Sequence, residues 1–397
     1  MPISTRLGHS RARTADPAQR CRAVLSTHSA VALSDWMDDP SPDVVRAAIT
    51  RLTEIEGVGA APSLRARLLS ADLSVTVDIA RALRRLGDGA ALQVAIDGLG
   101  AEQPSVRRAA VQALGALGDQ AAAVALGAAL RDPAAGVRAA ALEALVDVGM
   151  GPDAAHEVAR LLSDPAPSVR IVAVRALART MPRPGALLTA SAGDRDWQVR
   201  LEIARHLGGL PDATASALLT DRNPSVREAA ARAAGSRQVE QLAAVLVDDP
   251  ASGVRRAAAT TLGHLADGRA SDWLISALED GDAIVRAAVL RALVDRLTQP
   301  GAVRRISAEL DSERPQRRRA VLYALAHLKT REPLADVGRL ADDSNPDVRL
   351  AVLHVADALL ADPRPIVRHL AADADRTVRD SAQNWLVRHP YDGGSCA

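Results

Sequence analysis

The sequence predicts an all-α fold, an α-solenoid built from about twelve stacked helical hairpins. The first observation is a recurrence: a Val-Arg pair returns about every 31 residues, as in Pro104-Ser105-Val106-Arg107. A period of roughly 20 to 50 residues is typical of arrays in which each unit packs on its neighbours. The second observation is composition: the 397 residues include no Phe and two Tyr, so Ala, Leu, Val and Ile must form the core. Ala and Leu favour helices.

Twelve copies of the repeat align on the position before the arginine, which we call the valine slot, and the next position is the arginine slot. Eleven of the twelve valine slots hold valine. In chain order the slots are Val44, Val75, Val106, Val137, Val169, Val199, Val226, Val254, Val285, Arg317, Val348 and Val378. We therefore predict that the valine slot marks the core register of every repeat.

One repeat illustrates the expected hairpin. The Asp132-Pro133 step ends one helix, because proline disfavours the α conformation in the residue before it. The next helix is predicted to begin near Val137, and its apolar residues follow a helical period on one face: Val137, Ala141, Ala144, Leu145 and Val148. Gly149 suits the turn that ends this helix. Residues 154–163 then form a second helix before the next Asp-Pro step.

An aspartate stands six residues before most of the arginines, at a position that we call the aspartate slot. We expect the two side chains to pair and form a structural ladder that fixes the rotation between neighbouring hairpins. The pairs are Asp132 and Arg138, Asp164 and Arg170, Asp194 and Arg200, Asp221 and Arg227, Asp249 and Arg255, Asp280 and Arg286, Asp343 and Arg349, Asp373 and Arg379. In the second repeat both slots change together, to Ser70 and Thr76, which favours this interpretation over loose surface charge.

The Asp-Pro turn, the Val-Arg pair and the following Ala-Leu-Gly run resemble the HEAT repeat. In particular they resemble the short form found in phycobilisome-lyase-like HEAT proteins. The resemblance covers roughly residues 30 to 390. It implies a right-handed superhelix whose second helices line an inner, concave wall.

The domain organisation follows from the repeats. Residues 1–20 are expected to form a flexible arm, residues 21–390 the solenoid and residues 391–397 a disordered tail. Two short units predict a change of curvature or a hinge near residues 205–240. The tenth unit, from Asp311 to Arg318, is interpreted as having a loop one residue longer.

Residues one and five positions after the arginine slot are expected to face the concave wall and to bind a partner. These positions hold nine arginines and three acidic residues, although the net charge of the whole chain is +1. The candidate residues are Arg46, Arg81, Arg108, Arg175, Arg205, Arg232, Arg256, Arg291, Arg319, Tyr323 and His354. A basic stripe suits an anionic partner. An acidic protein segment and a nucleic-acid duplex held through its phosphates are both candidates, whereas base stacking is disfavoured by the scarcity of aromatic residues.

Enzyme signatures are weak. His156-Glu157 resembles one His-Glu motif of the HEAT-type deoxyhypusine hydroxylases, but no second His-Glu pair occurs in the sequence. Asp196-Trp197 invites comparison with HEAT-like DNA alkylpurine glycosylases, which are compact and irregular, so we expect Trp197 to pack in a loop between helices. His206 is expected to pack rather than to bind a metal. We therefore expect no catalytic residue, no cofactor and no metal site, with a HEAT-type lyase or hydroxylase as an alternative.

The cysteines and the lack of long apolar segments bear on where in the cell the protein is expected. Cys21 and Cys396 make neither a disulfide framework nor a metal site. No apolar core of a secretory signal and no membrane span is predicted, which favours the cytoplasm. Lys329 is the sole lysine among 49 basic residues, a bias typical of GC-rich bacterial genomes. The sequence thus predicts a non-catalytic scaffold or adaptor that binds a protein, with a DNA- or RNA-backbone-binding protein as the alternative.

Overall fold

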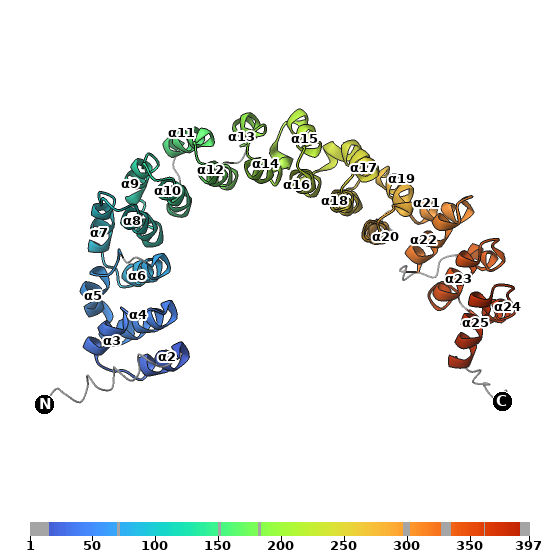
Figure 1. Ribbon diagram of the computed structural model, residues 1–397, viewed down its shortest axis with the longest axis horizontal. Helices are drawn as coiled ribbons and strands as arrows, with labels where there is room; N and C mark the ends of the chain where they lie inside the picture. The colour runs from blue at the N-terminus through green and yellow to red at the C-terminus, as the bar shows by residue number, and fades with distance from the viewer. Residues whose placement is uncertain are drawn as a thin grey trace. The chain divides into compact units, whose positions relative to one another are not determined.

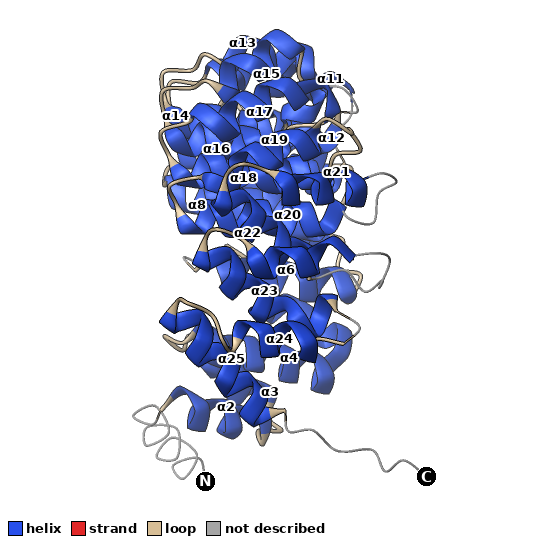
Figure 2. Cartoon of the chain, turned by 90° about the vertical axis from the view of Figure 1, so that its right-hand side faces the viewer, coloured by secondary structure: helices blue, strands red, loops and turns tan. Residues whose placement is uncertain are grey.

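The computed structural model describes residues 16–69, 72–149, 152–181, 184–296, 302–326, 335–360 and 362–389. Over these ranges the regular secondary structure is entirely helical (Figure 2), and no strand occurs in them. The predicted tail and the first fifteen residues of the predicted arm lie outside the described residues. The chain divides into two compact units, Met1–Ser191 and Ala192–Ala397.

Unit 1 has two layers of helices (Figure 1). We call the helices that carry the valine slot, together with α2, the Val-Arg helices. They are α2 (Pro17–Leu25), α4 (Pro42–Glu56), α6 (Leu73–Arg85), α8 (Pro104–Leu117), α10 (Ala135–Val148) and α12 (Pro167–Thr180). The second layer is α3 (Ala30–Trp36), η1 (Gly57–Ala60), α5 (Ala61–Arg65), α7 (Ala90–Gly98), α9 (Ala122–Ala129), α11 (Pro152–Arg160), η2 (Leu161–Ser163) and α13 (Gly185–Ser191).

Unit 2 repeats this arrangement. Its Val-Arg helices are α14 (Trp197–Ala204), α16 (Pro224–Ala233), α18 (Ser252–His264), α20 (Ala283–Arg296), α22 (Pro315–Leu325), α23 (Pro346–Leu359) and α25 (Arg376–Arg388). Its second layer is η3 (Leu207–Gly209), α15 (Asp212–Leu219), η4 (Ser236–Gln238), α17 (Val239–Asp248), α19 (Ala270–Ser276), η5 (Ala277–Glu279), α21 (Ala302–Ala308), η6 (Glu309–Asp311), η7 (Ala335–Asp342) and α24 (Arg364–Leu370). Within each unit, consecutive Val-Arg helices pack on each other and form the inner layer (Figure 1).

The valine slot lies in the core, as predicted. Ten of the eleven slot valines are at most 6% exposed, and Val106 is half-buried. In α10 the predicted apolar face is also buried, since Val137, Ala141 and Leu145 are at most 1% exposed. Helix α10 begins at Ala135, two residues before the predicted position. The all-α solenoid is therefore confirmed, whereas the right-handed superhelix stays a prediction.

Glycine has a steric role at two kinds of place. Gly87, Gly118 and Gly149 take positive φ angles of 70°, 66° and 94° at the ends of Val-Arg helices, where an L side chain would be strained. Gly263 of α18 has an ordinary φ but faces α20 so closely that an added Cβ would lie 2.7 Å from the Cβ of Ala292. This glycine allows α18 and α20 to pack directly against each other.

Two parts of the chain differ from the expected pattern. Residues 17–20, predicted to belong to a flexible arm, form the first turn of α2. The two short units lose length from their Val-Arg helices, because α14 has 8 residues and α16 has 10, against 14 in α10 and α12. The hinge near residues 205–240 stays a prediction.

Candidate partner-binding face and the arginine ladder

A ladder arginine can connect two consecutive repeats, as Arg138 illustrates. Its Nη1 donates to the backbone carbonyls of Asp132 at 2.8 Å and Pro133 at 3.0 Å. Its Nε and Nη2 donate to the carboxylate of Asp164, both at 2.7 Å. The prediction of the side-chain partner was therefore wrong: the aspartate six residues earlier supplies its backbone carbonyl, and the aspartate of the next repeat supplies the carboxylate.

The same Arg-Asp pair recurs at eight places in the described residues. At seven of them Nε and Nη2 both donate to the carboxylate, whereas Arg20 donates to Asp39 through Nη2 alone. In these pairs the arginine side chains are 5–15% exposed and the aspartate side chains 2–9%. The pairs are Arg20–Asp39, Arg107–Asp132, Arg138–Asp164, Arg200–Asp221, Arg227–Asp249, Arg255–Asp280, Arg318–Asp343 and Arg349–Asp373. Two hydrogen bonds between planar groups fix the relative orientation of the helices that carry them.

This geometry explains substitutions that a pairing within one repeat does not. Position 45 is Val45 in the arginine slot, and the next aspartate slot is Ser70; one repeat further, Thr76 is followed by Ala101. At these two places the arginine is thus absent together with the aspartate that follows it. Sequence reasoning also missed Arg20 and Arg107, because a glutamine fills the valine slot beside Arg20 and an alanine stands six residues before Arg107.

The ladder arginines shift the titration of their partners. The hydrogen bond from Arg107 lowers the pKa of Asp132, and Arg255 and Arg349 lower the pKa of Asp280 and Asp373 in the same way. Each carboxylate also accepts a backbone N–H from two residues ahead, as Asp280 does from Asp282 at 2.8 Å. A single aspartate therefore shapes its own turn and holds the preceding helix.

The candidate face consists of the residues one and five positions after the arginine slot. The structure places all eleven candidates on Val-Arg helices or at their ends, and none is buried: Arg256, Arg319 and Tyr323 are half-buried and the other eight are exposed. Side chains on successive helices meet across this face. The hydroxyl of Tyr323 lies 3.1 Å from Nδ1 of His354, and Arg256 Nη2 donates to Glu228 at 3.3 Å. Residues at the candidate positions of adjacent helices are thus in contact at these two places of unit 2.

The face is less basic than the sequence predicted, because acids outside the two counted positions reach it. Arg46 pairs with Asp43 and Asp78, each at 2.9 Å. Arg205 pairs with Glu202 at 2.8 Å. In all, five candidate arginines pair with carboxylates: Arg46, Arg205, Arg232, Arg256 and Arg319.

Three candidate arginines remain as exposed cations. Arg81 on α6, Arg108 on α8 and Arg291 on α20 make no ion pair with any residue that the structure describes. Arg81 and Arg108 lie on neighbouring helices of unit 1. The candidate positions therefore include both neutralised pairs and isolated positive charges.

Four cavities of unit 2 open between consecutive Val-Arg helices at this face. One of about 510 Å³ lies between α14 and α16 and is lined by Arg205 and Arg232. Two, of about 600 and 420 Å³, lie between α20 and α22 and share Leu290 and Tyr323. The fourth, of about 340 Å³, lies between α23 and α25 and is lined by His354. Six of the eleven candidate residues line these cavities: Arg205, Arg232, Arg291, Arg319, Tyr323 and His354. A further cavity of about 350 Å³ in unit 1 is lined by none of the candidates.

The residues considered for catalysis have structural contacts. Glu157 accepts hydrogen bonds from Arg131 at 2.9 Å and Arg160 at 3.2 Å, while His156 beside it is exposed. Asp196 caps α14 by accepting the N–H of Gln198 at 2.8 Å. Trp197 is the first residue of α14 and is 40% exposed, so it does not pack in a loop as expected.

The described residues were also considered for metal binding and for membrane insertion. His206 is half-buried, and its Nε2 lies 3.7 Å from Glu202. Within the described ranges, no cluster of three His, Cys, Asp or Glu side chains could hold a metal ion. None of the helices described is both long and apolar enough to cross a membrane.

Comparison with known proteins identifies the repeat. A model of HEAT repeats matches residues 70–146 and 239–325. Together with the stacked hairpins, this match defines the class: an all-α repeat solenoid. The chain contains HEAT repeats over these two stretches. The finer resemblance to the phycobilisome-lyase-like form stays a prediction, and a comparison with curated protein sequences gives no match.

Solved structures with a similar fold include two larger solenoids. Kap95p, in a structure on how its binding induces the switch loops of RanGDP to adopt the GTP-bound conformation, is 14% identical with a TM-score of 0.50; the match covers 95% of this chain and 62% of that one. Kap121p is 14% identical with a TM-score of 0.51, over 94% of this chain and 45% of that one. The chain thus spans about half the length of these structures, and the likeness concerns the fold.

Proposed function

We propose that this protein is a non-catalytic scaffold or adaptor that binds a protein partner along the candidate face. The observation that carries the proposal is the row of four cavities between Val-Arg helices of unit 2, all lined by residues of that face. Cavities that recur at one face offer side-chain pockets in series. Such a series suits an extended or helical polypeptide better than a single small molecule.

The charge pattern favours a protein over a nucleic-acid duplex. Duplex binding depends on many unpaired cations that displace the counterions of the phosphates. Five of the nine arginines already pair with carboxylates of this chain. Those carboxylates would repel phosphates, whereas a protein can place its own acids and bases to match a face of mixed charge.

The fold comparison supports the proposal only in outline. Kap95p, as its structure is described, binds RanGDP, and a likeness in fold does not transfer a partner. We propose an acidic protein segment as the partner, because the exposed cations Arg81, Arg108 and Arg291 are left for its carboxylates. The location of the protein in the cytoplasm is part of the same proposal.

Site-specific photo-crosslinking tests the proposed face. A benzophenone amino acid is placed singly at Arg81, Arg108 or Arg291 in the full-length chain, and in control variants at Val124 of α9 or Val247 of α17, which are 85% and 59% exposed on the second layer. The same protein should crosslink from the three face positions and not from the controls. Equal crosslinking from the second layer would contradict the proposal.

Duplex binding is measured on the same preparations. Fluorescence anisotropy with a random labelled duplex at about 50 mM salt should show no binding. Tight binding whose logarithm falls steeply with the logarithm of salt concentration would replace the protein partner with a nucleic acid.

A further inference from the structure

We call the contact between a ladder arginine and the aspartate slot of the next repeat a step. A step is closed where that slot supplies a carboxylate to the arginine, and open where it does not. In unit 2, the step that begins at Arg286 is open. Arg286 of α20 makes the usual backbone bonds, since its Nη1 donates to the carbonyls of Asp280 at 2.6 Å and Gly281 at 3.1 Å. The next aspartate slot, however, is Ser312. No carboxylate of the described residues pairs with Arg286.

Ser312 keeps every role of the missing aspartate except the carboxylate. Its carbonyl accepts Nη1 of Arg318 at 2.6 Å, as the carbonyl of Asp343 accepts Nη1 of Arg349 at 2.7 Å. Its hydroxyl accepts the N–H of Arg314 at 3.3 Å, as the aspartates do at their own turns. The tenth unit is therefore in register with the others, and the longer loop predicted from Asp311 is wrong. Asp311 instead pairs with Arg339.

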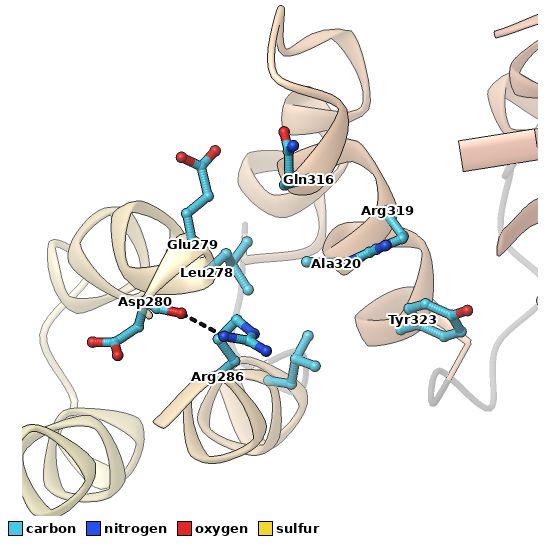
Figure 3. A pocket seen from close by; sticks show the side chains of 9 residues that line it. Leu278, Glu279, Asp280, Arg286, Gln316, Arg319, Ala320 and Tyr323 are labelled. Atoms are coloured by element: carbon cyan, nitrogen blue, oxygen red, sulfur yellow. Dashed lines mark hydrogen bonds between the residues drawn. The ribbon is translucent and has the colours of Figure 1, made fainter. Parts of the chain in front are cut away.

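The open step coincides with the cavity of about 600 Å³ between α20 and α22. Figure 3 shows Arg286 on one side of it and Gln316, Arg319 and Tyr323 on the other, with the dashed bond from Arg286 to the carbonyl of Asp280. The Nε and Nη2 atoms of Arg286, which bind a carboxylate in the closed steps, have no such partner here. At the other steps, this is where the aspartate of the next repeat binds.

The acids that line the cavity are already neutralised. Glu279 accepts a hydrogen bond from Arg314 at 2.9 Å, and Asp280 accepts two from Arg255 at 2.7 and 2.8 Å. Arg319 lies 3.5 Å from the exposed Asp347. The cavity thus contains one arginine without a carboxylate and a second that is weakly paired, and it has a net attraction for an anion.

We propose that this cavity binds the carboxylate of an aspartate or glutamate side chain from a partner protein, which takes the place of the missing ladder aspartate on Arg286. The inference rests on the proposed function, because it names a side-chain pocket of that interface. A planar carboxylate matches the guanidinium edge with two parallel hydrogen bonds, the geometry of seven of the eight closed steps. The neighbouring cavity of about 420 Å³, lined mainly by apolar residues such as Leu290 and Val294, accommodates an apolar side chain beside the acid.

The experiment measures binding of a defined probe to the full-length chain. The probe is a short fluorescein-labelled peptide, capped at both ends, with one glutamate between two leucines; a matched peptide has glutamine instead. Fluorescence anisotropy should give a dissociation constant about tenfold or more lower for the glutamate peptide. Equal affinity for the two peptides would overturn the proposal.

Two variants locate the site. Ser312→Asp supplies the missing carboxylate in cis and should abolish the preference for glutamate while leaving the fold intact, as circular dichroism checks. Arg286→Gln should abolish it as well. A Ser312→Asp protein that still prefers the glutamate peptide would place that binding elsewhere and reject the proposal.

Two further measurements are needed. The first distinguishes a carboxylate from a phosphate as the bound anion, and the second distinguishes failure of this inference from failure of the proposed function. Acetate and inorganic phosphate are compared as competitors; phosphate that competes much better than acetate would overturn the assignment to a carboxylate. In the crosslinking experiment, a partner that binds wild type and Ser312→Asp equally well would sink this inference and leave the protein-binding face in place. No partner at the face, with the peptide preference intact, would reject only the broader function.

Discussion

The step from α18 to α20 and the step from α20 to α22 are consecutive in unit 2 and start from the same arginine. Arg255 and Arg286 both donate Nη1 to the carbonyl six residues earlier, at 2.8 and 2.6 Å. Arg255 then binds the carboxylate of Asp280, and Gly263 lets α18 approach α20 closely. At the next step serine replaces the aspartate, Val294 stands at the position of Gly263 in the repeat, and two cavities lie between the helices. A closed step holds the solenoid together, whereas an open step leaves an arginine to a ligand.

The largest expected difference between the two steps is in stability. Arg255→Ala removes the hydrogen-bonded cation from the nearly buried carboxylate of Asp280, so the free energy of unfolding measured with denaturant should fall by about 3 kcal/mol. Arg286→Ala removes only hydrogen bonds to carbonyls and should lower the free energy of unfolding by about 1 kcal/mol. Equal losses at the two positions would contradict the comparison. An exposed pair provides the scale: Arg160→Ala should change the free energy of unfolding by less than about 1 kcal/mol.

Helix packing gives the next largest effect. Gly263→Ala places a Cβ 2.9 Å from the Cα of Ala292, so α18 and α20 must separate, and stability should fall by about 1 to 3 kcal/mol. Gly127→Ala is the matched control in α9, because an added Cβ meets nothing within 4 Å. It should stabilise the protein slightly, since alanine is the better helix former. Thermal unfolding that leaves Gly263→Ala as stable as Gly127→Ala would show that the close approach is not needed.

Closing the open step should stabilise the protein modestly. Ser312→Asp adds a bidentate pair to Arg286 in a partly exposed site, worth about 1 kcal/mol. The double variant Arg286→Ala with Ser312→Asp should lose that gain, so a double-mutant cycle isolates the new pair. A Ser312→Asp protein less stable than wild type would mean that the carboxylate does not reach Arg286.

The smallest effect concerns pH. Arg255 holds the pKa of Asp280 below its ordinary value. A carboxylate with a depressed folded pKa stabilises the fold above its unfolded pKa of about 3.9, and this contribution is lost as pH falls through the folded pKa. The stability gap between wild type and Arg255→Ala should therefore narrow from about pH 5 down to pH 3. Arg286 lowers the pKa of Asp280 only through its charge and more weakly than Arg255 does, so the gap for Arg286→Ala should narrow much less over the same range. An equal narrowing would contradict the absence of a carboxylate partner.

The repeat and the core register followed from the sequence, because each depends on which helix face a residue occupies. Ten of the eleven slot valines are buried. The candidate arginines are not buried, and their role in binding stays a prediction. The carboxylate partner of each arginine could not be predicted, because the aspartates of its own repeat and of the next lie at equally regular spacings, and only the packing of hairpins brings one of them close.

Other features left weaker signals or none. Asp78 and Glu202 pair with arginines of the candidate face but do not lie one or five positions after the arginine slot. The sequence therefore predicted a face that is more basic than the one observed. Arg296, only 1% exposed, donates to Ser271 and to the carbonyls of Leu262 and Leu265, an arrangement that no repeat pattern announces. Ser312 could have been found by aligning each aspartate slot with the arginine of the preceding repeat.

The most direct test of the open ladder step is to observe the two arginines together. The full-length chain is labelled with ¹⁵N-arginine, and the Nε–Hε resonances of Arg255 and Arg286 are assigned with single variants and followed while the glutamate peptide is added. The resonance of Arg286 should shift as peptide is added and reach a plateau, with the same dissociation constant that the anisotropy gives. The resonance of Arg255 should stay in place. An unchanged Arg286 resonance at saturating peptide would contradict the account.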